Sequence, residues 1–469
     1  MNKNKGLLSD LSFSHKDDFF IDDIIDYSKI PISFVMQWPR QLAKYGICDD
    51  ISLMVYFADN KMLMPIIIML QQFNVTIHLA NRHIFEEQIR NIGDDYCFIS
   101  DILYENRFIV HEINLLNKAI YIYCNKNKRE GHKKLHDIKF VFYTSGTTGD
   151  ENKIIRTQKK LIDEAYGIIN SLNFCEKDII LCNAPVFHSY GQAFGCFAAC
   201  LAKCKVKYLP SFLIPSHILK ELEKNSYTIL ISTPYYYNMI YDQLDKSNEL
   251  RYMLSAGGKL SRDVISSGIK INNVYGTTET GAISIQQYKN GGTCASVGTP
   301  IDGVKILLGK YVYNEHGVSI YEIYVDSKYI YDYRVKKNKV EAYIGHEFYL
   351  GDIGYIDQNG NLFIYGRNDS VINLNGEKIS LHEIETVLLS HPYVENVKVV
   401  ACEKNSVPYY IEAYIVLSKN NNCTKQELRQ YIRSRLDFHK IPRFIHIVES
   451  LEITETGKIL NKQGYKNNT

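Results

Sequence analysis

The chain has 469 residues, of which 45% are hydrophobic and 23% are charged. This composition excludes a small disulfide-stapled protein and a disordered one, and the length predicts about two to four domains. The 54 Lys and Arg residues against 52 Asp and Glu residues leave a net charge of +2, so charge gives no reason to expect a nucleic-acid or membrane partner.

No segment has the features of a membrane helix, a signal peptide or a zinc site. The longest wholly apolar run, residues 62–70, is far shorter than a membrane helix, and the polar start lacks the layout of a signal peptide. We therefore expect a cytoplasmic protein. The 11 cysteines lack zinc-site spacing, and the four-residue spacing of Cys196, Cys200 and Cys204 predicts a buried helix face.

The middle of the chain alternates short apolar runs with longer amphipathic stretches. This βαβα rhythm predicts an α/β fold with a mostly parallel sheet covered by helices on both faces. Helices are expected at residues 160–173 and 218–224. The predicted strands are residues 140–143, 179–182, 229–232, 252–255 and 271–275.

Two changes of pattern follow. Residues 304–365 show short alternating segments with glycine turns, which predict a small antiparallel barrel or sheet. Beyond them, Ser380 with Glu383 and Thr424 with Glu427 have capping-box spacing and predict two helices, with strands at 396–402 and 410–417. We place a domain boundary near Asp369, between a large domain (1–368) and a small α+β domain (369–469).

The strongest local motif is FYTSGTTG at residues 142–149, directly after an apolar strand. Its two glycines and four hydroxyl residues offer backbone N–H groups and small donors, as a polyphosphate requires. The motif is not a GxxxxGK[ST] P-loop, because no Lys-Ser/Thr pair follows the second glycine. From this segment alone, an ordinary Ser/Thr-rich turn is the alternative.

This segment resembles the signature loop of the adenylate-forming enzymes, a superfamily of acyl- and aryl-CoA synthetases, peptide-synthetase adenylation domains and luciferases. Six further segments match that superfamily in order and approximate spacing, so the resemblance spans residues 140–460; residues 1–135 carry no motif that we identify. The six are PVFHSYG (185–191), SAGGKL (255–260), NVYGTTE (273–279), LGDIG (350–354), GRNDSVINLNGEKISLHEIE (366–385) and TETGKI (454–459).

The resemblance implies a large N-terminal domain of sheets with a small β-barrel, followed by a small, mobile C-terminal domain. It also implies a nucleotide site and a Mg²⁺ ligand, Glu279, whose carboxylate suits that ion. From the residues alone, Glu279 could equally cap a surface turn, and Asp352 could be a turn residue. The implied nucleotide contacts are Thr144, Ser145, Gly146, Thr147, Thr148, Gly149, Gly257, Gly258, Tyr275, Gly276, Thr277, Thr278, Asp352 and Arg367.

Lys458 is the catalytic residue that the resemblance implies. A carboxylate that attacks the α-phosphorus of ATP brings two anions together, and a compact cation stabilises them. In the family, the small domain delivers this lysine and then swings about a hinge that matches Asp369. The swing presents a segment that includes Asn373 and Gly376 for transfer of the acyl group to a thiol.

The segment PVFHSYG narrows the class of carboxylic acid that is expected as the substrate. It holds no carboxylate to pair with an α-amino group, and His188 matches the gate residue of acyl- and aryl-CoA ligases, although a core histidine is the alternative. We therefore expect a carboxylic acid without an α-amino group, aryl or otherwise flat. The implied acid pocket consists of His188, Tyr190, Tyr235, Tyr236 and Gly281.

These segments together predict an AMP-forming acid–thiol ligase that uses ATP and Mg²⁺. Coenzyme A is the preferred acceptor, and the phosphopantetheine thiol of an acyl or peptidyl carrier protein is the alternative. A second alternative is a nucleotide-binding pseudoenzyme, because Asp150 to Lys153 lack the family's Pro and Gly and place the lysine one position late. Phosphate contact by Lys153 is left open, as is the oligomeric state.

Overall fold

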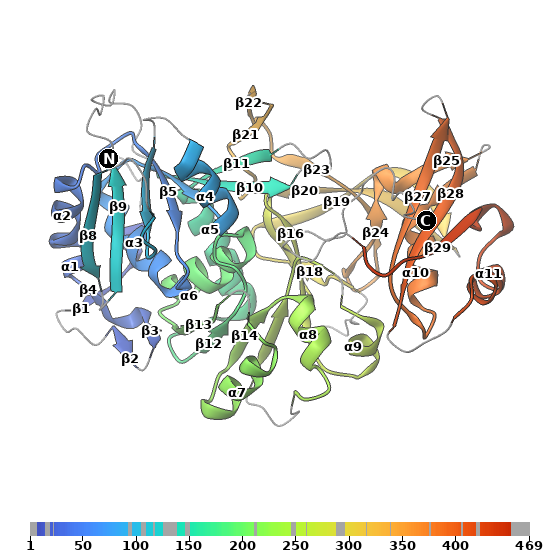
Figure 1. Cartoon of the computed structure of the whole chain (residues 1–469), viewed down its shortest axis with the longest axis horizontal. Helices are drawn as coiled ribbons and strands as arrows, with labels where there is room; N and C mark the ends of the chain where they lie inside the picture. The colour runs from blue at the N-terminus through green and yellow to red at the C-terminus, as the bar shows by residue number, and fades with distance from the viewer. Residues whose placement is uncertain are drawn as a thin grey trace.

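The computed structural model describes residues 7–14, 19–21, 23–91, 96–104, 109–115, 118–124, 138–145, 151–210, 213–244, 250–258, 260–287, 296–315, 317–337, 339–374, 377–404, 407–418 and 423–451. Two nine-stranded sheets, a four-stranded antiparallel sheet and a C-terminal α+β unit make up this part of the chain. The C-terminal unit, coloured orange to red, lies at one end of the long axis (Figure 1).

The first sheet has a parallel centre, β10-β6-β5-β7, and antiparallel strands on both flanks. Much of it comes from the N-terminal region in which the sequence showed no motif. In spatial order, its strands are β22 (Lys339–Ala342), β21 (Tyr333–Lys336), β11 (Glu151–Thr157), β10 (Lys139–Ser145), β6 (Thr76–Leu79), β5 (Ser52–Tyr56), β7 (Tyr96–Ser100), β9 (Lys118–Cys124) and β8 (Ile109–Leu115).

The second sheet is parallel from β16 to β13 and antiparallel at both edges. Three predicted strands, at 179–182, 229–232 and 252–255, have the predicted bounds. In spatial order, its strands are β18 (Thr299–Pro300), β17 (Gly281–Ile285), β16 (Asn272–Thr277), β15 (Tyr252–Ser255), β14 (Ile229–Ser232), β12 (Ile179–Cys182), β13 (Lys205–Tyr208), β3 (Ile24–Asp26) and β2 (Phe20–Ile21).

The two sheets share one apolar core. Alternate residues of the central strands face it, such as Leu53 and Val55 from β5, whereas Met54 faces the outer side of the first sheet. The outer faces carry helices of their own, so apolar residues occur on both faces of each sheet. The main helices of this region are α3 (Leu63–Met69), α4 (Arg82–Asn91), α5 (Gln158–Leu172), the π-helix η5 (Gly191–Ala198), α6 (Ala199–Leu201), α7 (Ser216–Lys224), α8 (Pro234–Ile240) and α9 (Arg262–Ser266).

The cysteine repeat is buried, as predicted, but it is not confined to one helix. Cys196 lies on η5, Cys200 on α6, and Cys204 lies beyond the end of α6. Short elements complete the N-terminal region: η1 (Leu7–Asp10), β1 (Phe13–Ser14), η2 (Tyr27–Lys29), β4 (Ile30–Pro31), α1 (Ser33–Met36), α2 (Trp38–Lys44), η3 (Asn60–Met62) and η4 (Leu70–Gln72). Within the described ranges, no helix has the length and apolarity needed to cross a membrane.

The expected antiparallel segment forms an open sheet of β19 (Val304–Glu315), β20 (Val318–Ser327), β23 (Glu347–Ile356) and β24 (Leu362–Arg367). The hairpin β21–β22 between β20 and β23 leaves this sheet and extends the first one. Asp332 directs it there: its Oδ2 accepts the Thr157 N–H at 2.7 Å, and its own N–H donates to the Ile155 oxygen at 2.9 Å.

The C-terminal unit has an apolar core of its own, formed by residues that include Ile384, Val399 and Ile432. Thr424 and Glu427 form the complete capping box that the sequence predicted. Ser380 also caps its helix, but the Glu383 carboxylate pairs with Lys440 at 2.8 Å. The elements are η7 (Asn368–Ser370), β25 (Val371–Leu374), β26 (Glu377–Ser380), α10 (Leu381–Leu389), β27 (Val394–Lys404), β28 (Val407–Leu417), α11 (Lys425–Arg433), η8 (Phe438–Lys440) and β29 (Phe444–Ile447).

We predict that Thr424→Ala loosens α11, because its hydroxyl accepts the Glu427 N–H at the first turn. Loss of such a cap costs about 1 kcal/mol. Hydrogen exchange of the α11 amides in the intact protein should accelerate by roughly fivefold, the equivalent of that cost. Thr424→Ser, which keeps the hydroxyl, is the control and should exchange like the wild type. Equal protection in all three proteins would contradict a stabilising role for the box.

Candidate functional site

Three predicted nucleotide residues from separate motifs meet at one point. Tyr275 lies on β16, Asp352 on β23 and Arg367 at the end of β24, where the β23–β24 pairing sets Asp352 opposite Arg367. The Tyr275 hydroxyl donates to Asp352 Oδ2. Arg367 Nη1 lies 3.4 Å from Asp352 Oδ1 and donates to the Leu350 oxygen at 2.8 Å.

Burial governs the electrostatics of this cluster. It raises the pKa of Asp352, although the hydrogen bond from Tyr275 and the attraction of Arg367 oppose the shift. Burial also raises the pKa of Tyr275, and the neighbouring Asp352 adds to that shift. The cluster therefore presents a carboxylate whose ionisation is costly, and hydrogen-bond donors of a ligand would stabilise its charged form.

The turn between β16 and β17 holds the next group of predicted residues. A Cβ at Gly276 would lie 2.4 Å from the Gly281 oxygen, so the turn closes too tightly there for a side chain. Inside it, the Thr280 N–H donates to the Thr277 hydroxyl at 3.2 Å. The backbone carbonyl oxygen of Glu279 accepts the N–H of Tyr331, outside the turn, at 2.7 Å. Thr278 is half-buried.

Glu279 supplies the turn with a single half-buried carboxylate. Within the described part of the chain, no three His, Cys, Asp or Glu side chains gather as a metal cage. Mg²⁺ typically takes one or two protein carboxylates and completes its coordination with water and substrate phosphates. One carboxylate at an accessible turn therefore fits Mg²⁺ that arrives with a nucleotide.

The predicted phosphate loop joins β10 to β11. Thr144 and Ser145 end β10, and the backbone of Ser145 pairs with that of Glu151. The Thr144 hydroxyl donates to the Asn152 oxygen at 3.4 Å. Gly146, Thr147, Thr148 and Gly149 lie outside the described residues, as do Gly376 and Lys458.

Lys153 occupies the side of β11 that faces Tyr143. The two residues are opposite each other in the ladder, and Lys153 Nζ lies 5.5 Å from the centre of the Tyr143 ring. A lysine one place earlier would project from the other side of the strand, because successive side chains alternate.

The Tyr143 hydroxyl in turn lies 2.9 Å from Nδ1 of buried His78, and burial lowers the pKa of His78 to about 3. No sequence pattern singled out His78.

The carboxyl ends of four parallel strands carry the remaining predicted residues. His188 follows β12, Tyr235 and Tyr236 follow β14, Gly257 and Gly258 follow β15, and the Gly276 turn ends β16. Parallel strands bring their carboxyl ends to one edge of a sheet, where ligands commonly bind. Gly257 (φ +94°) and Gly258 are exposed, and a Cβ at Gly258 would lie 3.6 Å from Pro234.

The residues of the expected acid pocket differ in their burial and in their contacts. The His188 ring lies 4.5 Å from the Phe187 ring. The Tyr190 hydroxyl is buried without a hydrogen-bond partner among the described residues. Tyr236 accepts the Leu213 N–H at 3.2 Å, whereas Tyr235 is exposed. Gly281, at the start of β17, is packed against Glu164. The described contacts therefore do not gather these residues into one cavity.

Asp369, the predicted hinge residue, is exposed and lies in η7, the short helix that follows β24. Its Oδ1 is 3.7 Å from Nε of Arg367, so it adjoins the Asp352 cluster. The backbone of Asn373 pairs with that of Lys378 in the β25–β26 hairpin.

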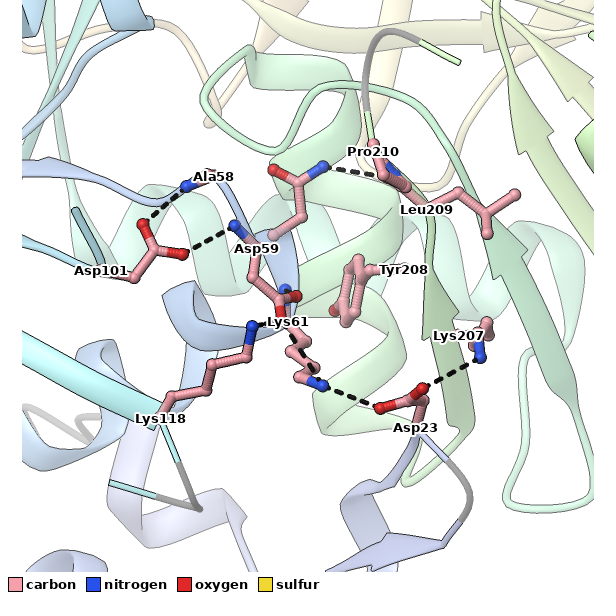
Figure 2. A pocket seen from close by; sticks show the side chains of 11 residues that line it. Asp23, Ala58, Asp59, Lys61, Asp101, Lys118, Lys207, Tyr208, Leu209 and Pro210 are labelled. Carbon is pink, nitrogen blue, oxygen red and sulfur yellow. Dashed lines mark hydrogen bonds and ion pairs between the residues drawn. The ribbon is translucent and has the colours of Figure 1, made fainter. Parts of the chain in front are cut away.

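A charged cavity of about 430 Å³ lies where β5, β7 and β13 end (Figure 2). Its charges neutralise one another: Lys61 Nζ is 2.9 Å from Asp23 Oδ1, and Asp59 Oδ2 is 3.1 Å from Lys118 Nζ. Lys207 also pairs with Asp23, and Asp101 accepts two backbone N–H groups. None of the residues that line the cavity belongs to the predicted set. We interpret it as a junction between chain segments.

We predict that Asp352→Asn stabilises the fold at neutral pH. The pKa of Asp352 is raised above 3.8, so the stability that its neutral form provides is complete below pH 3.8 and is lost as the pH rises through the folded-state pKa. The variant stays neutral and can still accept from Tyr275. Urea denaturation at a series of pH values should give equal free energies of unfolding for the wild type and Asp352→Asn at low pH. As the pH rises, the free energy of unfolding of Asp352→Asn should increasingly exceed that of the wild type. The opposite trend would mean that attraction by Arg367 outweighs burial.

Two family models match the chain. The AMP-binding enzyme model matches residues 81–324, and the AMP-binding enzyme C-terminal domain model matches residues 383–458. Among curated proteins, a 2-succinylbenzoate–CoA ligase of a Geobacillus strain is 24% identical over 92% of this chain and 90% of its own length. A malonate–CoA ligase of Arabidopsis thaliana is 25% identical over 71% of this chain, and the match spans 61% of that protein.

Solved structures agree with the fold. An O-succinylbenzoate coenzyme A synthetase of Bacillus subtilis, solved with ATP and a magnesium ion, has a TM-score of 0.69 and is 19% identical. The similarity covers 90% of this chain and 91% of that one. With the first family model spanning more than half of its length, the chain belongs to the family of AMP-binding enzymes.

Proposed function

We propose that this protein is an AMP-forming acid–thiol ligase: it converts a carboxylic acid without an α-amino group into an acyl adenylate and then transfers the acyl group to coenzyme A. The observation that carries the proposal is the convergence of Tyr275, Asp352 and Arg367 from three separate motifs. The curated relatives, named as CoA ligases, support the overall reaction.

The first step joins the acid to AMP. A carboxylate oxygen attacks the α-phosphorus of ATP, the bond to the bridging oxygen breaks, and pyrophosphate leaves with the electron pair. The buried Asp352 carboxylate would accept the ribose hydroxyls, and Glu279 would hold Mg²⁺. Bound there, Mg²⁺ would neutralise phosphate charge. Lys458 would place a positive charge between the two reacting anions.

The second step exchanges AMP for a thiol. The sulfur attacks the acyl carbon of the adenylate, the bond from that carbon to the phosphate oxygen breaks, and AMP leaves with the electron pair. The thiol proton passes to solvent or to a base. The exposed position of Asp369 in η7, between β24 and the C-terminal unit, is compatible with a hinge that reorients the C-terminal domain between the two steps.

The chemistry around His188 favours an acid without an ammonium group. Phe187, His188 and Ser189 provide no carboxylate at this edge of the sheet, and the tilted Phe187–His188 pair forms an aromatic surface. A flat or aryl acid matches such a surface through stacking. The two named relatives use different acids, succinylbenzoate and malonate. A pyrophosphate-exchange assay with a panel of acids would identify the acid that this protein uses.

We expect labelled pyrophosphate to exchange into ATP only when an acceptable acid is present. A panel of aryl, short-chain and medium-chain acids, with α-amino acids as the contrasting set, tests the proposal. Exchange confined to α-amino acids would overturn the interpretation of His188. Silence across the whole panel would favour the nucleotide-binding pseudoenzyme.

The acceptor needs a separate assay, because exchange reports only the first step. A preformed adenylate is offered either free coenzyme A or a holo carrier protein, and thioester formation is followed by mass spectrometry. Faster transfer to coenzyme A supports the proposal, whereas transfer confined to the carrier would replace coenzyme A with a phosphopantetheine arm.

We predict that Lys458→Ala reduces adenylate formation by roughly 100-fold or more, the usual effect of removing one group that stabilises transition-state charge. Transfer from a supplied adenylate to the thiol should remain near the wild-type rate. Lys462→Ala, a charge removal four positions later, is the matched control. An equal loss in both half-reactions for Lys458→Ala would contradict the delivery of this lysine for the first step alone.

A further inference from the structure

An ion pair is completely buried between β11 and α5. The side chains of Arg156 and Glu164 are 0% and 1% exposed, and Arg156 Nη2 lies 2.7 Å from Glu164 Oε2. Arg156 Nε and Nη1 have no hydrogen-bond partner within the described ranges. Because apolar side chains of similar size often stabilise a core at least as well as a buried ion pair, stability alone does not explain this one.

Glu164 also holds the start of β17. Its Oε1 accepts the Ala282 N–H at 2.8 Å. The preceding residue, Gly281, has φ +70°, and a Cβ there would lie 2.6 Å from the carboxylate carbon of Glu164. The carboxylate thus occupies the space beside Gly281 and fixes the strand that leaves the Glu279 turn.

A second set of contacts holds the other side of the same turn. The backbone carbonyl oxygen of Glu279 accepts the Tyr331 N–H at 2.7 Å. Asp332, which follows Tyr331, accepts the Thr157 N–H on β11 through its carboxylate, also at 2.7 Å. Lys160 on α5 lies 3.1 Å from Asp332 Oδ1. Both sides of the turn are therefore anchored to β11 and α5, the elements that follow the predicted phosphate loop.

We propose that Arg156 and Glu164 are positioning residues for Mg·ATP. Glu164 fixes the turn that carries Thr277, Thr278 and Glu279 by accepting from Ala282, and Arg156 neutralises and orients the Glu164 carboxylate. The pair thereby fixes the position of this turn relative to β11 and α5, the elements that carry Arg156 and Glu164. This inference rests on the proposed use of ATP, and neither residue touches substrate.

The test compares two double variants. Arg156→Met with Glu164→Met removes both charges and the acceptor for Ala282; Met matches Glu in length and is shorter than Arg. Arg156→Met with Glu164→Gln removes the charges but keeps an amide oxygen for Ala282. Titration calorimetry with the Mg²⁺ complex of α,β-methylene ATP measures nucleotide affinity without turnover, and pyrophosphate exchange gives the KM values for ATP and the acid.

We expect the Met/Met variant to fold and to lose roughly 10-fold or more in affinity for the analogue, the usual effect of removing an outer-shell partner. Its KM for ATP should rise in parallel and by more than its KM for the acid, because the loosened turn carries Thr277, Thr278 and Glu279, whereas most of the expected acid pocket lies on other elements. The Met/Gln variant should recover most of the affinity. If Met/Met fails to fold, Met/Gln is compared with the wild type instead. Because Met/Gln keeps the acceptor for Ala282 and loses only the charges, it should retain most of the wild-type affinity, and a loss of roughly 10-fold or more would contradict the proposal.

A matched control uses the ion pair between Asp178 and Arg251, whose Nη2–Oδ2 distance is 2.6 Å. It lies at the amino ends of β12 and β15, opposite to the candidate site. Asp178→Asn with Arg251→Met should change stability and leave affinity for the analogue unchanged.

Three outcomes would overturn the inference: wild-type affinity in a folded Met/Met variant, an equal rise of both KM values, or a Met/Gln variant no better than Met/Met. Failure of the proposed function is distinguishable, since the wild type would then bind the analogue without catalysing exchange with any acid.

Discussion

The apolar core shared by the two nine-stranded sheets is the constraint on which the site depends. Each sheet presents alternate residues to it, so the strands must keep a common register and direction at their centres. The carboxyl ends of β12, β14, β15 and β16 consequently meet at one edge. Polar loops that would be scattered in an extended chain converge there, because the hydrophobic effect fixes the strands that carry them.

The elements that sequence alone predicted are those with strong local signals. The strands at 179–182, 229–232 and 252–255 are short apolar runs between turns, and Thr424 with Glu427 is a local capping pattern. The hairpin β21–β22 was not predicted to join the first sheet, since that choice depends on a contact between Asp332 and Thr157, which are far apart in the chain.

The candidate site shows the same division. Tyr275, Asp352 and Arg367 stand in recognisable motifs, whereas His78 and the Arg156–Glu164 pair are distinguished only by their burial and their distant partners. A single His, Arg or Glu has no distinguishing neighbours in the sequence.

Asp352 has a consequence for the evolution of this protein. Its carboxylate is held where burial opposes ionisation, so the folded chain is less stable with that residue charged than it would be with a neutral one of the same shape. Under the proposed role of Asp352 as the acceptor of the ribose hydroxyls, selection for heat resistance and selection for nucleotide binding would act on this position in opposite directions. Homologues that have lost activity would be free to replace it, and the residue found there would distinguish working enzymes from retired ones.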